Sequence, residues 1–327
     1  MRPSELPRPM PRVHIVIPTH TTRHLRACVG ALCHQTDPPE TVVVSIDGDG
    51  DDIREELASI RGGPWAAAEA RGWRVPRLVT TSRPHQGIAL LNQVRNNGLR
   101  VLATSPSASD DDLVVVLDGD TVLATDAIAK HRSFAEAGSD IVIPYRVNLD
   151  ERATTLLDID ALLDLGCGPQ MIDQMLRPAE ASSLRARHAR YKRQLLTKRL
   201  APGWMGLVKT HKPKVIGGHH AVRLGVYRDV NGYDEAYEAY GCNDDDLALR
   251  FHMLTPRPRV HIAVRDILAF HLYHPTRALK GVTEAPGYAR FSRKNVSVRA
   301  GMGLTTPRAQ DEPVVGEIQH TSQMGAE

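Results

Sequence analysis

The sequence predicts an α/β protein with a Rossmann-like, mostly parallel sheet and helices on both faces. Apolar runs without period-two alternation, such as Val114–Leu117, are typical of strands buried on both faces of a parallel sheet. Segments with apolar residues at helical spacing separate these runs over residues 13–144. Two of the runs end in acidic residues, and such sheets bind ligands at the carboxyl ends of their strands.

The strands and helices of this part can be placed in order along the chain. Strands are expected at residues 13–18, 41–46, 78–81, 113–117 and 140–144. Helices are expected between them, at residues 23–35, 53–60, 88–103 and 126–137. This alternation favours a doubly wound, parallel arrangement.

The middle of the chain is strongly basic. Residues 177–214 contain eleven Lys or Arg and one Glu, and a basic helix is expected at residues 184–200. A solvent-exposed helix face is the first interpretation, and contact with a membrane or an acceptor is the alternative. Beyond it we expect sheet structure at residues 215–218, a helix at 247–253 and a strand at 266–270.

Composition limits the classes of function. A net charge of +3 is too small to indicate nucleic-acid binding. The four cysteines form no CxxC pair, which favours free thiols in a reducing compartment over a zinc cluster. No apolar stretch approaches the ~20 residues of a membrane span, and residues 1–11 lack the apolar core of a signal peptide. These features predict a cytoplasmic protein, with peripheral membrane contact through the basic helix as a further expectation.

The pair Asp118 and Asp120 is the first candidate site. Alternate residues of an extended segment point the same way, so both carboxylates can face one spot where the strand ends. Gly119 between them leaves room for close approach to the backbone. Two close carboxylates need a cation or must retain a proton, whereas a polar turn is the alternative interpretation.

Six motifs follow one another over residues 13–275. They read VHIVIPTHTTRHLRACVGALCHQT, VVVSIDGDGDD, RNNGL, VLDGD, VIGGHHAVRLGVYRDVNGYDEAYEAYGCNDDDLALR and AFHLYHP. In this order they resemble family-2 glycosyltransferases of the GT-A fold with a galactosyltransferase-like C-terminal half. The chain departs from the family pattern at three places. The usual Asn after the first strand is Thr21, the Asp-Asp-Gly-Ser run is Asp47-Gly-Asp-Gly, and the Glu-Asp pair is Asn243-Asp244.

The resemblance implies a divalent metal, Mn²⁺ or Mg²⁺, bound with the diphosphate of a nucleotide-sugar. Asp120 is then the main carboxylate ligand, and Asp118 holds ribose or a metal-bound water. His271 and His274 complete the metal shell, with His274 as the first choice. The alternative for each histidine is a structural residue, although Mn²⁺ does accept imidazole.

The resemblance also implies a donor site at the strand ends. Pro18 and Thr19 end the first strand beside the donor. Asp47 accepts the N–H of the base, usually uracil, with a turn cap as the alternative. Arg83 reaches the base or a phosphate, or is a surface arginine, and Arg95 packs near the donor, or forms a salt bridge on its helix.

The acceptor side is implied by the Gly-Gly turn and the acidic cluster. Asp244 is the expected general base for the acceptor hydroxyl, while Asp245 caps a helix and Asp246 begins it. The alternative is that all three acids cap that helix. Gly218, with Gly217, permits close backbone approach to the donor and acceptor.

Three further residues, His219, His220 and Trp204, are expected to shape the sugar pocket. The resemblance divides the chain into an arm (1–12), a nucleotide-sugar-binding half (13–150), a basic helical insertion (151–214), an acceptor-binding and catalytic half (215–304) and a flexible tail (305–327).

The leading functional hypothesis is a metal-dependent, inverting transferase that moves a sugar from a UDP-sugar to an acceptor hydroxyl. The acceptor is a glycan, a lipid-linked glycan, a small molecule or a peptide, and no nucleic-acid partner is expected. A retaining transferase remains open, because a fold does not fix stereochemistry. A sugar nucleotidyltransferase would have a Gly- and Lys-bearing loop after the first strand, which residues 18–23 lack. A catalytically silent binding protein would be expected to lose an acid from the metal pair or the base position, and both are present.

Overall fold

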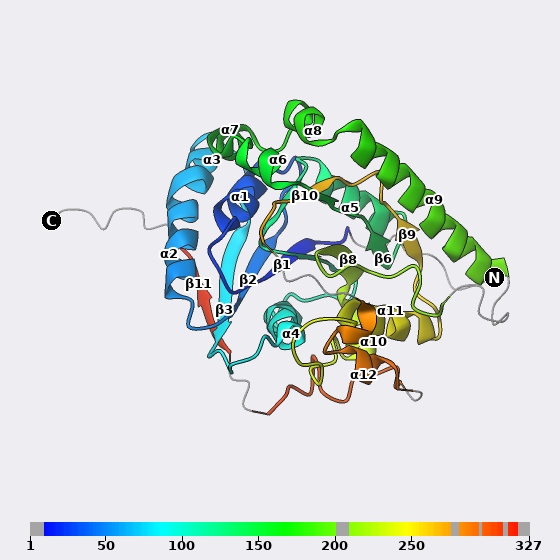
Figure 1. Cartoon of the computed structure of the whole chain (residues 1–327). Coiled ribbons are helices and arrows are strands. Elements are labelled where there is room, and N and C mark those ends of the chain that lie inside the picture. Colours follow the sequence, from blue (N-terminus) through cyan, green and yellow to red (C-terminus); the bar gives the residue numbers. More distant parts are fainter. Residues whose placement is uncertain (1–9, 201–208, 276–280, 294–295, 310–312, 320–327) are drawn as a thin grey trace.

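A computed structural model describes residues 10–200, 209–275, 281–293, 296–309 and 313–319 of the chain. Its centre is an eight-stranded sheet of order β11-β3-β2-β1-β4-β8-β6-β9 (Figure 1). The strands are β1 (Val13–Thr19), β2 (Thr41–Asp47), β3 (Arg77–Arg83), β4 (Leu113–Leu117), β6 (Ile141–Ile143), β8 (His219–Arg223), β9 (Val260–Ile262) and β11 (Val314–Glu317). Strands β3, β2, β1 and β4 are parallel neighbours, whereas β8 and β11 pair antiparallel.

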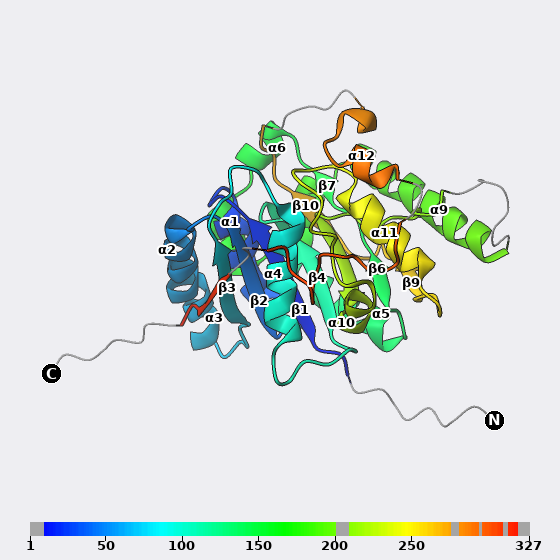
Figure 2. The same ribbon diagram turned by 90° about the horizontal axis from the view of Figure 1, so that it is seen from below.

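Helices cover both faces of this sheet, as expected. The helices are α1 (Leu25–Gly30), α2 (Asp51–Ile60), α3 (Ala66–Ala70), α4 (Leu91–Ala103), α5 (Ala127–Glu136), α6 (Glu151–Thr155), α7 (Ile159–Leu165), α8 (Pro169–Met175), α9 (Pro178–Leu200), α10 (Leu224–Val230), α11 (Asn243–Met253) and α12 (Tyr288–Phe291). Alternate residues of β1 divide the core between the two faces. Ile15 and Ile17 pack with α1, α2 and α5, and Val16 packs with α4, α10 and α11 on the other face. Figure 2 shows α4 crossing the face of β1 and β2.

A small three-stranded sheet stands beside the main one. Its order is β5 (Thr121–Leu123), β10 (Ala269–His271) and β7 (Val147–Asn148). Strand β10 runs antiparallel to β5, so that His271 is in register with Thr121. This pairing joins a late segment of the chain to the turn that follows β4, which no local pattern in the sequence predicts.

The alternating part of the chain follows the expected order. Every strand and helix expected between residues 13 and 144 is present, with ends shifted by a few residues. Later elements differ more. The sheet resumes at β8 rather than at residues 215–218, α11 begins four residues before the expected Leu247, and β10 begins at Ala269 because Asp266 lies in a turn.

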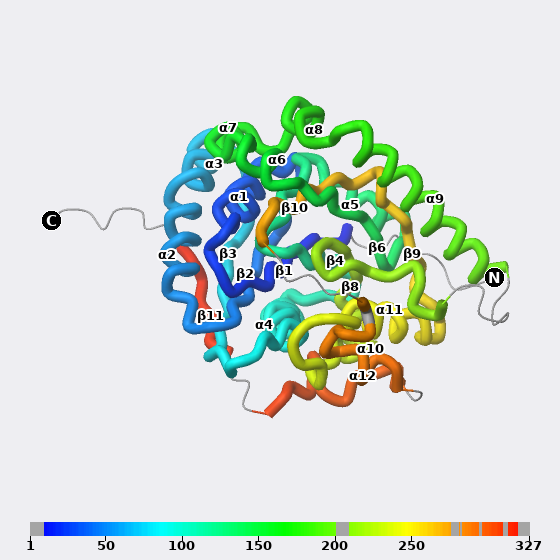
Figure 3. The backbone as a smooth tube through the Cα atoms, viewed as in Figure 1, coloured from blue at the N-terminus to red at the C-terminus, as the bar shows by residue number. Residues whose placement is uncertain are grey.

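The segments outside the alternating part also differ from expectation. The basic helix begins earlier than expected, as the 23-residue α9, and three short helices, α6 to α8, precede it; Figure 3 shows this path along one edge of the molecule. The tail contributes β11, which pairs with β3 and is therefore not loose over residues 314–317. In the arm, Arg12 donates to Asp112, and residues 1–9 lie outside the described part.

Two expectations from composition can be compared with the structure. All four cysteines are buried free thiols. Among the described helices, none is long and apolar enough to cross a membrane. The division of the chain into five parts stays a prediction. Because β4 and β8 are neighbours, the parts 13–150 and 215–304 share one sheet.

Candidate active site

The two acids of the VLDGD motif lie at the carboxyl edge of the sheet. Asp118 directly follows β4, and its backbone N–H donates to the carbonyl of Gly218 at 3.2 Å. That bond fastens the turn after β4 to the turn before β8. Gly119 faces the end of β1, where a Cβ would lie 3.4 Å from Thr19. The first, fourth and fifth motifs therefore meet at one edge.

Asp120 forms a cluster with His271 and His274. The Nε2 atoms of the two histidines lie 3.3 and 3.0 Å from Asp120 Oδ2, and the three ligand atoms fall within 4.8 Å of one another. Strand β10 positions His271, and the backbone N–H of Leu272 donates to the Asp120 carbonyl at 2.9 Å. The small sheet thus brings Asp120 together with two histidines that lie about 150 positions later in the sequence.

The cluster has the chemistry of a divalent metal site. Burial alone would raise the pKa of Asp120, but His271, Arg146 and His274 outweigh burial and lower it, so that the carboxylate is ionised at neutral pH. Adjacent ligands at about 2.1 Å from an octahedral ion lie about 3 Å apart, close to the spacing found here. One carboxylate and two imidazoles are a donor set that divalent transition metals accept.

Arg146 is a site residue that the sequence analysis missed. Its Nη1 lies 2.7 Å from Asp118 Oδ2, 3.4 Å from Thr121 Oγ1 and 3.8 Å from Asp120 Oδ1. It follows β6 in an irregular stretch and belongs to no motif, so no signal in the sequence marked it. The guanidinium partly balances the two carboxylates and is placed to meet an anion bound beside them.

Arg95 joins the two halves of the site. It is buried on α4, with Nη1 3.2 Å from Asp244 Oδ1 and Nη2 3.8 Å from Asp118 Oδ1. Its guanidinium lies 5.2 Å from the centre of the Tyr233 ring. The salt bridge considered for Arg95 therefore runs between elements and not along its own helix. One cation connects the acid that follows β4 with the expected base.

The Gly-Gly turn fits tightly between these groups. A Cβ on Gly217 would lie 2.1 Å from Arg95 Nη2, and one on Gly218 would lie 2.2 Å from Arg146 Nη1. The backbone N–H of Gly217 donates to Asp244 Oδ2 at 2.8 Å. A side chain at either position would have to displace the end of an arginine that contacts the acids of the site.

The three acids of α11 have different surroundings. Asp244 faces Arg95 and Gly217, with its side chain 25% exposed. Asp245 accepts from Lys212 at 3.1 Å and from Lys214 at 2.8 Å. Asp246 is buried and accepts from Arg250 Nε at 2.8 Å, and burial raises its pKa.

The helix-cap alternative for these acids is therefore wrong, as are the expected cap role of Asp245 and the expected helix start at Asp246. The helix begins at Asn243, and its N-cap is Cys242. Each of the three carboxylates accepts hydrogen bonds from groups that lie outside the first turn of the helix.

The residues expected around the base and ribose lie at the ends of β1, β2 and β3. Arg83 is buried and its Nη1 donates to Asp47 Oδ1 at 2.7 Å, so it is not a surface arginine. Asp47 therefore has a partner in the neighbouring strand and does not cap a turn alone. Pro18 and Thr19 end β1, between this pair and the acids after β4. Two strand spacings of about 4.8 Å separate the ends of β2 and β4, which leaves about 10 Å between the two groups.

Two of the residues expected in a sugar pocket are fully buried. His219 Nε2 lies 3.0 Å from His131 Nε2, and His220 bonds the hydroxyls of Tyr227 and Tyr233. Burial lowers the pKa of both histidines, so both are neutral at pH 7. They hold β8 in place and do not line a pocket, whereas Trp204 lies outside the described residues.

Sequence comparison finds one family match. Residues 207–260 match the model of the N-terminal domain of galactosyltransferase. The segment covers the Gly-Gly turn, β8, α10 and α11, and it includes Asp244. The predicted resemblance to glycosyltransferases is thereby confirmed for this segment. No curated protein matches the chain.

Several solved structures have a similar shape. TarS of S. aureus in complex with UDP-GlcNAc has a TM-score of 0.46 and 11% identity over 84% of this chain and 61% of its own. A mannosyltransferase from Pyrobaculum calidifontis, in complex with GDP-Man and Mn²⁺, has a TM-score of 0.46 and 17% identity, with 83% of this chain and 59% of its own covered. GalNAc-T7 with UDP, GalNAc and Mn²⁺ has a TM-score of 0.46 and 13% identity, with 82% and 45% covered. The chain spans about three fifths of the first two structures and less than half of the third.

Proposed function

We propose that the protein is a metal-dependent glycosyltransferase that moves a sugar from a UDP-sugar to an acceptor hydroxyl with inversion at the anomeric carbon. The observation that carries the proposal is the connected edge formed by Asp120 with its two histidines, Asp118, Arg95 and Asp244. The galactosyltransferase match over residues 207–260 supports it, because that segment supplies the last member of this edge.

The donor would lie along the carboxyl ends of β1, β2 and β4. Asp47, held by Arg83, offers a carboxylate oxygen to the N–H of a uracil base. Asp118 offers oxygens to ribose, about two strand spacings away, with Thr19 between them. Arg146 and Arg95 supply positive charge where the diphosphate would be placed.

The cation would be held by Asp120, His271 and His274, and the two nitrogen ligands favour Mn²⁺. A divalent ion at this position supplies Lewis-acid stabilisation of the leaving diphosphate. The lowered pKa of Asp120 keeps this ligand ionised without the ion, which prepares the site for binding.

Asp244 would take the proton of the acceptor hydroxyl as that oxygen attacks the sugar. Two donors, Arg95 and Gly217, fix its orientation. The carboxylate has further lone pairs, and its side chain is 25% exposed, so an acceptor hydroxyl can reach it. A single positioned base on the acceptor side fits direct displacement, which inverts the anomeric carbon.

The acceptor class and a membrane contact of α9 remain predictions. The exposed side of α9 carries Arg185, Arg190, Lys192, Arg193 and Arg199, and residues 181–200 contain no acid. Cosedimentation with anionic vesicles would test this contact.

A thermal-shift screen of nucleotide-sugars, with and without Mn²⁺, tests the proposal. One UDP-sugar should raise the melting temperature selectively, and only when Mn²⁺ is present, because a ligand that binds the folded state stabilises it by mass action. Equal responses to all nucleotide-sugars, or no response to any, would contradict the proposed donor site.

A further inference from the structure

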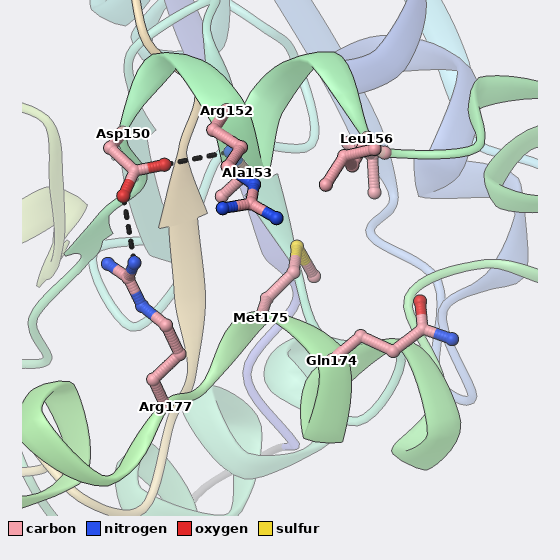
Figure 4. A pocket seen from close by; sticks show the side chains of 8 residues that line it. Asp150, Arg152, Ala153, Leu156, Gln174, Met175 and Arg177 are labelled. Atoms are coloured by element: carbon pink, nitrogen blue, oxygen red, sulfur yellow. Dashed lines mark hydrogen bonds and ion pairs between the residues drawn. The ribbon is translucent and has the colours of Figure 1, made fainter.

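A separate cavity of about 450 Å³ lies between α6 and α8 (Figure 4). Its floor is apolar and consists of Ala153, Leu157 and Met175, of which Met175 is buried. Leu156, which is 72% exposed, lies at the edge of the cavity. Figure 4 shows Leu156 and Met175 on opposite sides of one space. This volume is within the range of pockets that bind small molecules.

The rim of the cavity is polar and has one free cation among the described residues. Arg177 is already engaged, because it donates to Asp150 at 2.8 Å and to Glu180 at 2.5 Å. Arg152 is exposed and makes no hydrogen bond or ion pair within the described part of the chain, and its guanidinium lies above the apolar floor in Figure 4. Gln174 adds an amide on the opposite side. An anion at the rim would therefore bind Arg152 without displacing another ion-pair partner.

The cavity adjoins the segment that carries the metal-site histidines. The backbone N–H of Leu149, just before α6, donates to the carbonyl of His271 at 2.9 Å. The backbone N–H of Tyr273 donates to Thr154 Oγ1, on α6, at 2.8 Å. Two hydrogen bonds thus fasten α6 and the residue shortly before it to His271 and Tyr273. A molecule in the cavity would therefore contact α6, the helix that is bonded to the histidine segment.

We infer that the α6–α8 cavity holds the apolar part of an amphipathic, anionic acceptor, with the acid group at Arg152. The term acceptor rests on the proposed function, whereas the chemistry of the ligand rests on the cavity alone. The hydroxyl that receives the sugar would extend from the cavity past Asp120 and its histidines to Asp244, the proposed base. Proximity of this kind is what a transfer between two bound substrates requires.

The lining favours this class of ligand over the alternatives. A bare sugar has little apolar surface to place against Leu157 and Met175, so this apolar lining would gain little from its binding. A neutral apolar molecule would form no ion pair with Arg152, which would remain bound only to water. A bilayer surface would meet protruding side chains such as Leu165 on α7, which is 69% exposed, rather than a concave site.

Calorimetric titration with octyl phosphate, below its micellar concentration, tests the cavity. The wild-type protein should bind it, and Leu156→Gln should weaken binding about five- to tenfold, because part of a leucine side chain is no longer covered. Leu165→Gln is the matched control, since this leucine has a similar exposure on the neighbouring helix but does not line the cavity. Equal affinities for wild type and Leu156→Gln, or equal losses in both variants, would overturn the inference.

The charge at the rim has its own test. Arg152→Gln should remove a preference of about tenfold for octyl phosphate over octyl glucoside and leave octyl glucoside binding unchanged. Arg265→Gln, an exposed arginine outside the cavity, should keep the preference. Loss of the preference in both variants would indicate general charge attraction and contradict a specific role of Arg152.

A third titration separates this inference from the proposed function. Octyl phosphate should bind equally well or better when UDP and Mn²⁺ are present, because an acceptor and a donor must be bound together. Mutual exclusion would assign the cavity to the donor and overturn the acceptor assignment. If UDP and Mn²⁺ do not bind at all, the proposed function fails while the octyl phosphate result stands. The protein could instead bind vesicles but not octyl phosphate, with vesicle binding abolished by both Leu156→Gln and Leu165→Gln. That result would show a membrane-binding surface and overturn the inference of a ligand cavity.

Discussion

Replacement of Asp244 by asparagine removes the proposed base while it preserves the shape of the site. The side-chain carbonyl of Asn can still accept from the Gly217 N–H, which lies 2.8 Å from Oδ2. The amide nitrogen then faces Arg95, whose Nη1 is 3.2 Å from the other oxygen. One charge-assisted hydrogen bond is therefore lost, and the proton can no longer be accepted.

The two consequences differ in size. Loss of a charge-assisted bond to a buried arginine lowers the free energy of unfolding by about 2 kcal/mol. Domains are stable by about 5–15 kcal/mol, so the variant stays folded at assay temperature. Loss of a general base lowers kcat by ~10²–10⁴, with donor Kd nearly unchanged. A rate loss of this size cannot come from a small unfolded fraction.

The assay compares kcat, donor Kd and melting temperature in Asp244→Asn and in Asp245→Asn. Asp245 is the control because it lies next to Asp244 but holds Lys212 and Lys214. Its replacement should lower the melting temperature and leave kcat near the wild-type value. A wild-type kcat in Asp244→Asn, or the same fall of kcat in both variants, would refute the role of Asp244.

Three further predictions concern the metal-site histidines, the Gly-Gly turn and Asp112. His274→Ala should weaken Mn²⁺ binding more than His271→Ala, because the Nε2 atom of His274 lies closer to the shared Asp120 oxygen, at 3.0 against 3.3 Å. Calorimetric titration with Mn²⁺ measures both variants, and negligible effects in both would mean that the histidines are structural residues. Gly218→Ala places a Cβ 2.2 Å from the Arg146 guanidinium and should lower kcat/KM at least about tenfold in a folded protein, so unchanged kinetics would contradict the tight turn. For Asp112, burial raises the pKa, but two basic neighbours outweigh it and lower the pKa from 3.8 to about 2. Asp112→Asn should therefore cost about 2 kcal/mol of unfolding free energy at pH 7, and urea titrations should show the difference vanish as pH falls from about 4 to about 2, whereas a pH-independent difference would argue against an ionised Asp112.

The alternating part of the fold could be read from the sequence because its signals are local. Buried strands such as Leu113–Leu117 are continuous apolar runs, and helices such as Leu91–Ala103 show apolar spacing. The antiparallel strand His219–Arg223 was misplaced by a few residues, since its ends are set by pairing with β4 and β6. Strand Val314–Glu317 was missed because its four residues are all exposed and gain their structure only from the edge of β3.

The candidate site shows the same division. Asp118 and Asp120 were identifiable because acid-Gly-acid follows a buried strand. Arg146 was not, because its role comes only from tertiary contacts with those acids. His219 and His220 were assigned to a pocket although their strand is buried on both faces, which makes each a core residue with a specific partner.

The most direct test of the central claim is release of UDP from the UDP-sugar that the thermal-shift screen selects. The wild-type protein should release UDP only with Mn²⁺, and Asp120→Ala should fall to background while its melting temperature stays close to the wild-type value. Equal UDP release by wild type and Asp120→Ala, or release that persists in EDTA, would contradict a metal-dependent glycosyltransferase built on Asp120, His271 and His274.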